Sequence, residues 1–201
     1  MEEAIRMARA GLNAQRLTTA GAELADEIGF DQVTVSALAR RVGVAVASLY
    51  AHVRGSDDLR TRIALLALAE LADRAADAVA GRSGRDALAG LADAYRDYAR
   101  EHPGRYAAAR LRLDPATAAA SAGGRHTRLL RAVLHGYRMP EQEQTHAVRL
   151  IGATIHGYLD LAAAGGFSHS DPDPQDSWPR ILDALDASLR HWPGAPTDVD
   201  V

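Results

Sequence analysis

The stretch that decides the fold reads LADEIGFDQVTVSALARRVGVAVASLYAHVRGSDDL, from Leu24 to Leu59. Its apolar residues recur at spacings of three and four, the pattern of a helix with one buried face. Gly29 and Gly43 interrupt the pattern, and glycine is the residue that most often ends a helix. Thr34 precedes the second apolar run, where its hydroxyl can accept a hydrogen bond from a free backbone N–H. The stretch therefore predicts short helices separated by tight turns.

Two of these helices form a predicted helix-turn-helix from Thr34 to Val53, with the first ending at Gly43 and the second beginning near Ala45. DNA-binding proteins use such a pair to place the second helix in the major groove. Many short helix pairs are purely structural, so the spacing alone leaves both interpretations open. The predicted core side of the motif consists of Val35, Leu38, Ala39, Val42, Val44, Leu49 and Val53, with Tyr50 beside it.

Helical spacing continues on both sides of the motif, and the β-branched and aromatic runs typical of strands are missing. The predicted fold class is all-α, with about nine helices: a three-helix helix-turn-helix domain followed by a larger helical domain. The alanine-rich stretch before Arg125 and residues 168–176 are expected to be loops. The other expected helices span about 13–28, 56–79, 86–101, 105–113, 125–137, 141–164 and 177–191.

The composition limits the class of protein. The chain has 201 residues, of which 47% are hydrophobic, so a packed core is available. It contains no cysteine, which excludes disulfides, thiolate zinc sites and cysteine nucleophiles. The first ten residues lack the apolar centre of a signal peptide, and no stretch approaches the ~20 apolar residues of a membrane span. We therefore expect a cytoplasmic protein without a cofactor, a bound metal or a membrane partner.

The charge distribution favours a local nucleic-acid surface. A net charge of −3 argues against a protein that coats nucleic acid with its whole surface. Residues 32–56, however, contain Arg40, Arg41 and Arg54 and no acidic residue. This basic segment coincides with the predicted helix-turn-helix, where a local patch matters more than the total charge. Arg40 and Arg41 either support DNA binding electrostatically or belong to an ordinary solvated face, and the second interpretation is favoured for Arg41.

The quoted stretch resembles the DNA-binding domain of the TetR family of bacterial regulators. The resemblance lies in a glycine and an aromatic after the first helix, then threonine, an LA…GV turn, LYxHV, and an acidic-leucine start to the fourth helix. Two later segments, YRDYAREHPGRY from Tyr95 and LIGATIHGYLDLAAAGGF from Leu150, resemble a TetR subgroup named for a Trp-His-Gly motif. His156 and Gly157 are present, while the tryptophan expected nearby is not.

The resemblance implies a DNA-contacting surface on the motif. Val46 and Ala47 would face base edges, where their apolar side chains can touch thymine methyl groups or exclude water but cannot form paired hydrogen bonds. Arg54 would contact a phosphate, and Ser56 would cap the fourth helix so that its N-terminus faces phosphate. The residues expected to contact DNA are Thr34, Ser36, Val46, Ala47, Ser48, Tyr50, His52, Arg54 and Ser56.

The resemblance also implies a DNA-binding domain over residues 1–60, an effector-binding and dimerisation domain over 61–192 and a tail over 193–201. The last two helices would pair with their copies in a homodimer. Gly152, Ala153 and Gly157 would allow close approach, and Leu182, Leu185 and Leu189 form an apolar stripe. The candidate ligand contacts, each of which can instead be an ordinary core residue, are Tyr95, Tyr98, Tyr106, Leu130, Tyr137, Thr154, His156 and Tyr158.

We therefore predict a TetR-type repressor that an unidentified small-molecule effector releases from a palindromic double-stranded DNA operator. An alternative is a family member that keeps the helical dimer and its ligand pocket but has lost specific DNA binding, because Val46 and Ala47 are apolar. An enzyme is not expected, since no nucleophile, base or metal set stands out. His169 and the aspartates of 171–176 resemble a metal loop only superficially.

Overall fold

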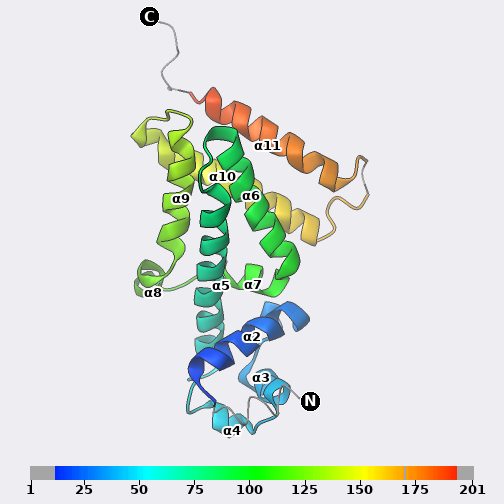
Figure 1. The fold of residues 1–201 in the computed structure, drawn as a ribbon. Helices are drawn as coiled ribbons and strands as arrows, with labels where there is room; N and C mark the ends of the chain where they lie inside the picture. The colour runs from blue at the N-terminus through cyan, green and yellow to red at the C-terminus, as the bar shows by residue number, and fades with distance from the viewer. Residues whose placement is uncertain (1–11, 170, 194–201) are drawn as a thin grey trace, which may run out of the picture. The chain divides into compact units, whose positions relative to one another are not determined.

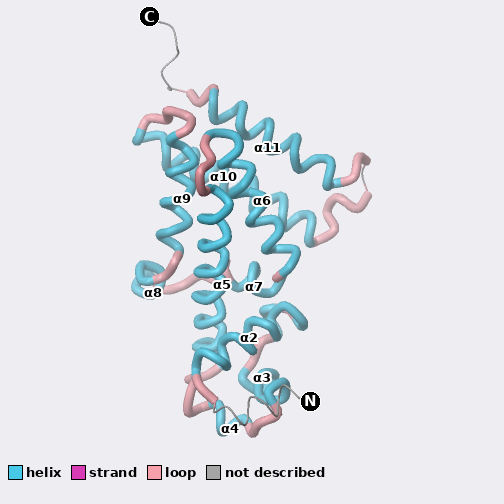
Figure 2. The backbone as a smooth tube through the Cα atoms, viewed as in Figure 1, coloured by secondary structure: helices cyan, strands magenta, loops and turns pink. Residues whose placement is uncertain are grey.

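The computed structural model describes residues 12–169 and 171–193, and every regular element within them is a helix (Figure 1). No strand occurs in these residues, as the tube in Figure 2 also shows, so the predicted all-α class is confirmed. Ten α-helices are described, against about nine expected. The elements are α2 (Ala14–Ile28), η1 (Phe30–Gln32), α3 (Val35–Val42), α4 (Val46–Leu49), α5 (Ser56–Val79), α6 (Gly84–Glu101), α7 (Pro103–Ala108), α8 (Pro115–Ala120), α9 (Gly123–His135), α10 (Glu141–Ala163) and α11 (Pro174–Arg190).

The chain forms two compact units, one within residues 1–71 and 98–123 and the other within residues 72–97 and 124–201. The long helices α5 and α6 contribute to both units, because a division falls inside each of them. The helix-turn-helix lies in the first unit together with α7 and α8. A functional boundary between residues 60 and 61 stays a prediction.

The first unit is built around one apolar cluster to which α2, α3, α4 and the start of α5 all contribute. Leu17, Leu38, Leu49 and Leu59 are fully buried at its centre. Burying each such leucine contributes about 1.5–3 kcal/mol, so these four side chains hold the short helices of the motif in place. Since α3 and α4 are too short to be stable alone, their positions depend on this cluster.

A glycine fixes the packing of α7 on α2 in the same unit. A Cβ atom on Gly104 would lie 2.0 Å from the carbonyl oxygen of Ala25. No other residue fits there without moving the backbone of one helix. Gly104 therefore allows α7 to approach α2 more closely than side chains would permit.

The second unit packs α9, α10, α11 and parts of α5 and α6 around a separate core. Leu88, Leu134, Ile151 and Leu189 are buried in it. Its buried polar groups are paired: the Tyr137 hydroxyl donates to Asp186 at 2.7 Å, and the Trp178 indole N–H donates to Asp93 at 2.8 Å. Such pairing offsets the cost of removing these groups from water.

Several elements differ from the sequence prediction, among them α4, which ends at Leu49 before Val53. The alanine-rich stretch expected to be a loop contains α8, because Asp114 accepts hydrogen bonds at 3.1 Å from the N–H groups of Ala116 and Thr117 and proline follows as the first helical residue. Helix α11 begins three residues before the expected start, since Asp173 caps it in the same way. The helix expected over 105–113 is α7, which starts at Pro103 and ends at Ala108.

Candidate nucleic-acid interface

Helix α3, the first helix of the motif, is capped at its start and ended at its last turn by local interactions. Thr34 caps α3, with its hydroxyl oxygen accepting from the N–H of Ala37 at 3.0 Å. Gly43 ends α3 in the left-handed conformation, with φ of 71° and ψ of 33°. The chain then turns directly into α4, whose preceding residue, Ala45, supplies no side-chain cap. The predicted cap at Thr34 and stop at Gly43 are both present.

Two apolar side chains set the orientation of α4. Leu49, its last residue, is fully buried, and Val53, four residues after the end of the helix, is 1% exposed, so both anchor this segment in the core of the first unit. In contrast, Val46 is 36% exposed and Tyr50 is 58% exposed. The helix consequently presents its first residues and Tyr50 to solvent, the exposure that contact with DNA requires.

All nine residues expected to contact DNA lie outside the core. His52 and Ser56 are half-buried, and the remaining seven are exposed. The residues predicted for the core side of the motif are buried, except for the half-buried Val44. Whether each exposed residue contacts DNA stays a prediction.

Ser56 has a different role from the expected one. Its hydroxyl oxygen accepts a hydrogen bond at 3.1 Å from the N–H of Val35, the first residue of α3. Ser56 is itself the first residue of α5, and the carbonyl of Gly55 accepts from Leu59 to start that helix. The serine therefore helps to cap α3 rather than α5, and ties the two helices together.

Arg54 has an exposed guanidinium group next to an acidic partner. Its side chain is 88% exposed, and its Nη2 atom lies 3.3 Å from Asp58 Oδ1. Asp58 also accepts from the backbone N–H of Arg54 and from Arg62 Nε, both at 3.0 Å. Burial alone would raise the pKa of Asp58, but these hydrogen bonds outweigh it and lower that pKa. The carboxylate thus fixes the backbone of Arg54 and leaves the guanidinium accessible.

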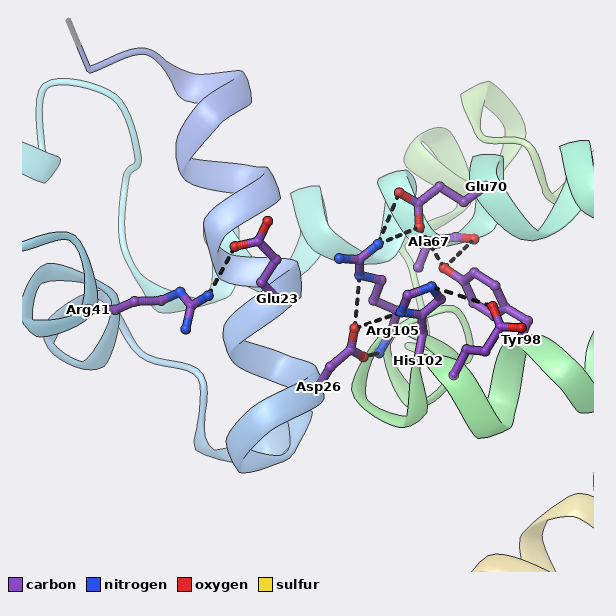
Figure 3. A network of polar contacts seen from close by, with 9 residues as sticks. Glu23, Asp26, Arg41, Ala67, Glu70, Tyr98, His102 and Arg105 are labelled. Atoms are coloured by element: carbon purple, nitrogen blue, oxygen red, sulfur yellow. Dashed lines mark hydrogen bonds and ion pairs between the residues drawn. The ribbon is translucent and has the colours of Figure 1, made fainter. Parts of the chain in front are cut away.

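Arg41 has an intramolecular role. Its guanidinium donates to Glu23 at 3.0 Å and to Glu27, both on α2. Burial lowers the pKa of Arg41, but the two carboxylates outweigh it and raise that pKa. Figure 3 shows the pair between Arg41 and Glu23. Arg41 therefore holds α3 to α2, whereas Arg40 is exposed.

A second polar network in the first unit, shown in Figure 3, surrounds Arg105 on α7. Its Nε atom lies 3.1 Å from Asp26 Oδ2, and its Nη1 atom lies 3.3 Å from Glu70 Oε2. Tyr98 donates its hydroxyl proton to Glu70 at 2.8 Å, and His102 Nδ1 lies 3.1 Å from Asp26. Burial and the neighbouring Glu70 carboxylate raise the pKa of Tyr98.

This network was not predictable from local sequence patterns. Its members come from α2, α5, α6 and α7, and the residues that pair are 28 to 79 positions apart. No local pattern reports pairing at such distances. The only signal was the polar character of these residues within otherwise apolar helices.

The eight candidate ligand residues do not form one cluster. Tyr98 and Tyr106 belong to the first unit, and the other six belong to the second. Within the second unit, the ring centroids of Tyr95 and His156 are 5.6 Å apart, and the Tyr95 hydroxyl pairs with Nδ1 of His126. The Thr154 hydroxyl donates a hydrogen bond to the carbonyl of Leu150 in the same helix. His126 had not been singled out as a ligand contact.

A cavity of about 840 Å³ lies in the second unit, between the end of α10 and the start of α11. Of the candidate ligand residues, Tyr158 alone lines it. Its other lining residues include Phe167, Asp171, Asp176, Arg180 and Ile181.

Within residues 12–169 and 171–193, no helix is both long and apolar enough to cross a bilayer. The same part of the chain contains no group of three or more histidine, cysteine or acidic side chains placed to hold a metal ion.

Two family models match the chain. The model described as "Bacterial regulatory proteins, tetR family" matches residues 17–62, and the model described as "Tetracyclin repressor-like, C-terminal domain" matches residues 88–185. Together they cover the helix-turn-helix and most of the remaining helices.

Two curated proteins are similar over most of their length. The uncharacterized HTH-type transcriptional regulator YobS of Bacillus subtilis is 31% identical over 182 residues, which is 90% of this chain and 91% of that protein. The uncharacterized HTH-type transcriptional regulator Rv0681 of Mycobacterium tuberculosis is 34% identical over 152 residues, which is 74% of this chain and 69% of that protein.

Solved structures share the fold. The crystal structure of the putative regulatory protein SCO4313 has a TM-score of 0.70 at 21% identity, covering 86% of this chain and 94% of that one. TetR-Q116A from Acinetobacter baumannii, in complex with minocycline, has a TM-score of 0.66 at 21% identity, covering 93% of this chain and all of that one (100%).

Proposed function

Because the chain belongs to the TetR family of bacterial transcriptional regulators, we propose that it represses transcription as a homodimer on a palindromic DNA operator and leaves the operator when a small-molecule effector binds. The observation that carries the proposal is the division of the helix-turn-helix into a buried anchor and an exposed face. Leu49 and Val53 are buried, while the residues assigned to DNA lie outside the core.

The exposed groups suit two kinds of DNA contact. Thr34, Ser36 and Arg54 offer hydroxyl or guanidinium groups that suit phosphate oxygens, which position a protein on DNA without reading sequence. Ser48, Tyr50 and His52 supply further polar groups, and Val46 and Ala47 face base edges. Arg54 carries the only full positive charge of this set, so its contact with a phosphate should depend on salt concentration more than the other contacts do.

Helices α10 and α11 are the proposed dimer interface. Leu150, Ala153, Gly157 and Leu161 are spaced by three, four and four residues, so they follow one stripe of α10. Leu150 is 37% exposed and Leu161 is 53% exposed, which leaves part of this stripe uncovered in the single chain. A Cβ atom on Gly157 would meet nothing within 4 Å, so packing inside the chain does not require glycine there. In the proposed homodimer, α10 of a second copy covers this stripe, and glycine at position 157 lets the two helices approach closely.

The effector is proposed to bind within residues 61–192, in the second unit, to which six of the eight candidate residues belong. Tyr158 supports this proposal because it also lines the 840 Å³ cavity, which is large enough for a drug-sized molecule. The effector acts by binding two conformations unequally, which changes the separation of the recognition helices from the roughly 34–36 Å that paired half-sites require. Assignment to the Trp-His-Gly subgroup stays a prediction that His156 and Gly157 support.

A gel-shift assay with the full chain and the DNA upstream of its own gene tests the proposal. We expect a specific band that weakens with rising salt and that Tyr50→Ala and His52→Ala each diminish. Arg131→Ala is a matched control, because this exposed arginine lies on α9 in the other unit. A dimer without any specific band would instead favour the alternative function, a family member that has lost DNA recognition. A thermal-shift screen of small molecules identifies the effector class.

A further inference from the structure

The recognition segment lacks the side chains that usually read bases. From Val42 to Val53 the chain contains no arginine, lysine, asparagine, glutamine or acidic residue. Those are the side chains that form paired hydrogen bonds with guanine or adenine, or accept a hydrogen bond from cytosine, in the major groove. The polar groups present belong to Ser48, Tyr50 and His52, each with a hydroxyl or an imidazole. The motif therefore lacks most of the side chains with which proteins usually recognise bases by hydrogen bonding.

The exposed start of α4 is apolar instead. Val46 and Ala47 are its first two residues, and the N-terminal residues of the second helix are those that meet base edges in a helix-turn-helix. Both are exposed, although Leu49 of the same short helix is fully buried. The branched side chain of Val46 therefore presents methyl groups to solvent at the position that enters the groove.

Thymine is the base that matches this surface, because its C5 methyl group is the apolar group that a standard base pair displays in the major groove. We infer that this protein recognises T·A base pairs in each half-site through the thymine methyl group, with Val46 and Ala47 as the specificity-determining residues. The inference rests on the proposed operator binding and names the chemical feature of the operator that is read.

A competing source of specificity is DNA shape. Phosphate contacts from Arg54 and the hydroxyl groups carry no sequence information, but the cost of deforming DNA varies with sequence. Shape readout does not depend on a methyl–methyl contact between Val46 and one particular thymine. Removing methyl groups from either partner separates the two explanations.

The operator is first selected from random double-stranded DNA with the full-length protein. Each thymine is then replaced by uracil, which keeps every hydrogen-bonding group and removes the methyl group alone. Covering one methyl group is worth about fourfold in affinity, so one thymine in each half-site should show a loss of about that size. Uracil placed at thymines outside the protected region is the control and leaves affinity unchanged.

A double-mutant cycle assigns the contact to the protein side chain. In Val46→Ala, the loss caused by uracil at the contacted thymine should shrink to less than about twofold, because the two γ-methyl groups of the partner side chain are gone. In Arg54→Ala, overall affinity falls but the fourfold ratio between thymine and uracil persists. Circular dichroism verifies that each variant keeps its helix content.

The outcomes separate this inference from the proposed function. Specific operator binding that is insensitive to uracil at every thymine overturns the methyl readout and leaves the regulator intact. A uracil effect that is the same size in Val46→Ala, in Ala47→Gly and in the unmodified protein also overturns it, since another group is then the reader. Failure to select any sequence overturns both proposals together.

Discussion

The guanidinium group of Arg105 pairs with the carboxylate of Asp26, with 3.1 Å between Nε and Oδ2, and so joins α7 to α2. Asp26 also accepts from the backbone N–H of Arg105 at 2.9 Å, and Glu70 on α5 lies against the far end of the same side chain. The side chains of Arg105 and Asp26 are only 15% and 16% exposed. Three helices of the first unit are therefore connected through one arginine.

Arg105→Met should lower the free energy of unfolding by about 2 kcal/mol, because it leaves Asp26 and Glu70 partly buried without a cation. Urea denaturation followed by circular dichroism measures the change. Arg125→Ala is the control: its ion pair with Asp73 is 40% and 66% exposed, so the loss should be below about 0.5 kcal/mol. Equal losses in the two variants would show that burial does not strengthen the Arg105 pair.

Gly104→Ala should destabilise the first unit by more than about 2 kcal/mol, since the new Cβ would lie 2.0 Å from the carbonyl oxygen of Ala25 and one helix backbone must move. Gly124→Ala provides the comparison, because its Cβ would meet only the end of the Arg128 side chain, at 3.5 Å. Unfolding midpoints in urea report both effects. A Gly104→Ala protein as stable as Gly124→Ala would mean that α7 does not press on α2 in solution.

Gly157→Leu should convert the dimer to a monomer without unfolding the chain, because the position is open within the chain but lies on the proposed interface. Size-exclusion chromatography with light scattering gives the mass, and circular dichroism gives the helix content. Arg131→Leu adds a leucine at an exposed position of α9 and should remain dimeric. A dimeric Gly157→Leu protein would place the interface elsewhere.

Arg54→Ala should weaken DNA binding by a similar factor on every sequence. The 88%-exposed guanidinium is proposed to neutralise one phosphate, so the slope of log K against log salt should decrease by about 0.9. Gel shifts or fluorescence anisotropy at several salt concentrations measure this slope. A change in sequence preference with an unaltered slope would assign Arg54 to a base instead.

Asp58→Asn should reduce stability at neutral pH but not at low pH. Although burial raises the pKa of Asp58, hydrogen bonds from the Arg54 backbone and from Arg62 lower it overall. A carboxyl group whose pKa is lower in the folded state stabilises that state above its unfolded pKa, about 4. The difference between the unmodified protein and the variant should thus shrink as the pH falls below about 4.

Unfolding in urea across a pH series measures this difference for Asp58→Asn. Asp57→Asn removes the same charge from the exposed neighbouring position and should cost less stability at neutral pH. A constant difference between the unmodified protein and Asp58→Asn at all pH values would contradict the assigned hydrogen bonds.

Local signals in the sequence predicted the helices well. The bounds expected for α5, 56–79, coincide with Ser56–Val79, because a glycine precedes the helix and a glycine-rich stretch follows it. Thr34 and Gly43 act within a few residues of their own positions, so periodicity and capping rules locate them. Helix α8 was missed because a short capped turn in an alanine-rich stretch lacks an apolar face: none of its residues is buried.

The sequence predicted which side chains of the candidate site are exposed, but not which groups they form hydrogen bonds or ion pairs with. Helical spacing placed Leu49 and Val53 in the core, and the family resemblance placed Val46 and Tyr50 among the exposed residues. The partner of Ser56 is a backbone N–H 21 residues earlier, and that of Arg105 is a carboxylate 79 residues earlier. Such contacts depend on how whole helices pack, which single-residue preferences do not encode.

The buried and the exposed residues between Val46 and Val53 have separate roles, which affects how the operator preference of the protein can change during evolution. Leu49 and Val53 hold the helix in place, and neither is available to DNA. Val46, Ala47 and Tyr50 are exposed and carry almost none of that anchoring. With the proposed base readout, a substitution at an exposed position should alter the favoured base at little cost in folding free energy, within the roughly 0.5 kcal/mol typical of surface changes. On this proposal, operator preference can change by one exposed side chain at a time while Leu49 and Val53 keep the helix in place.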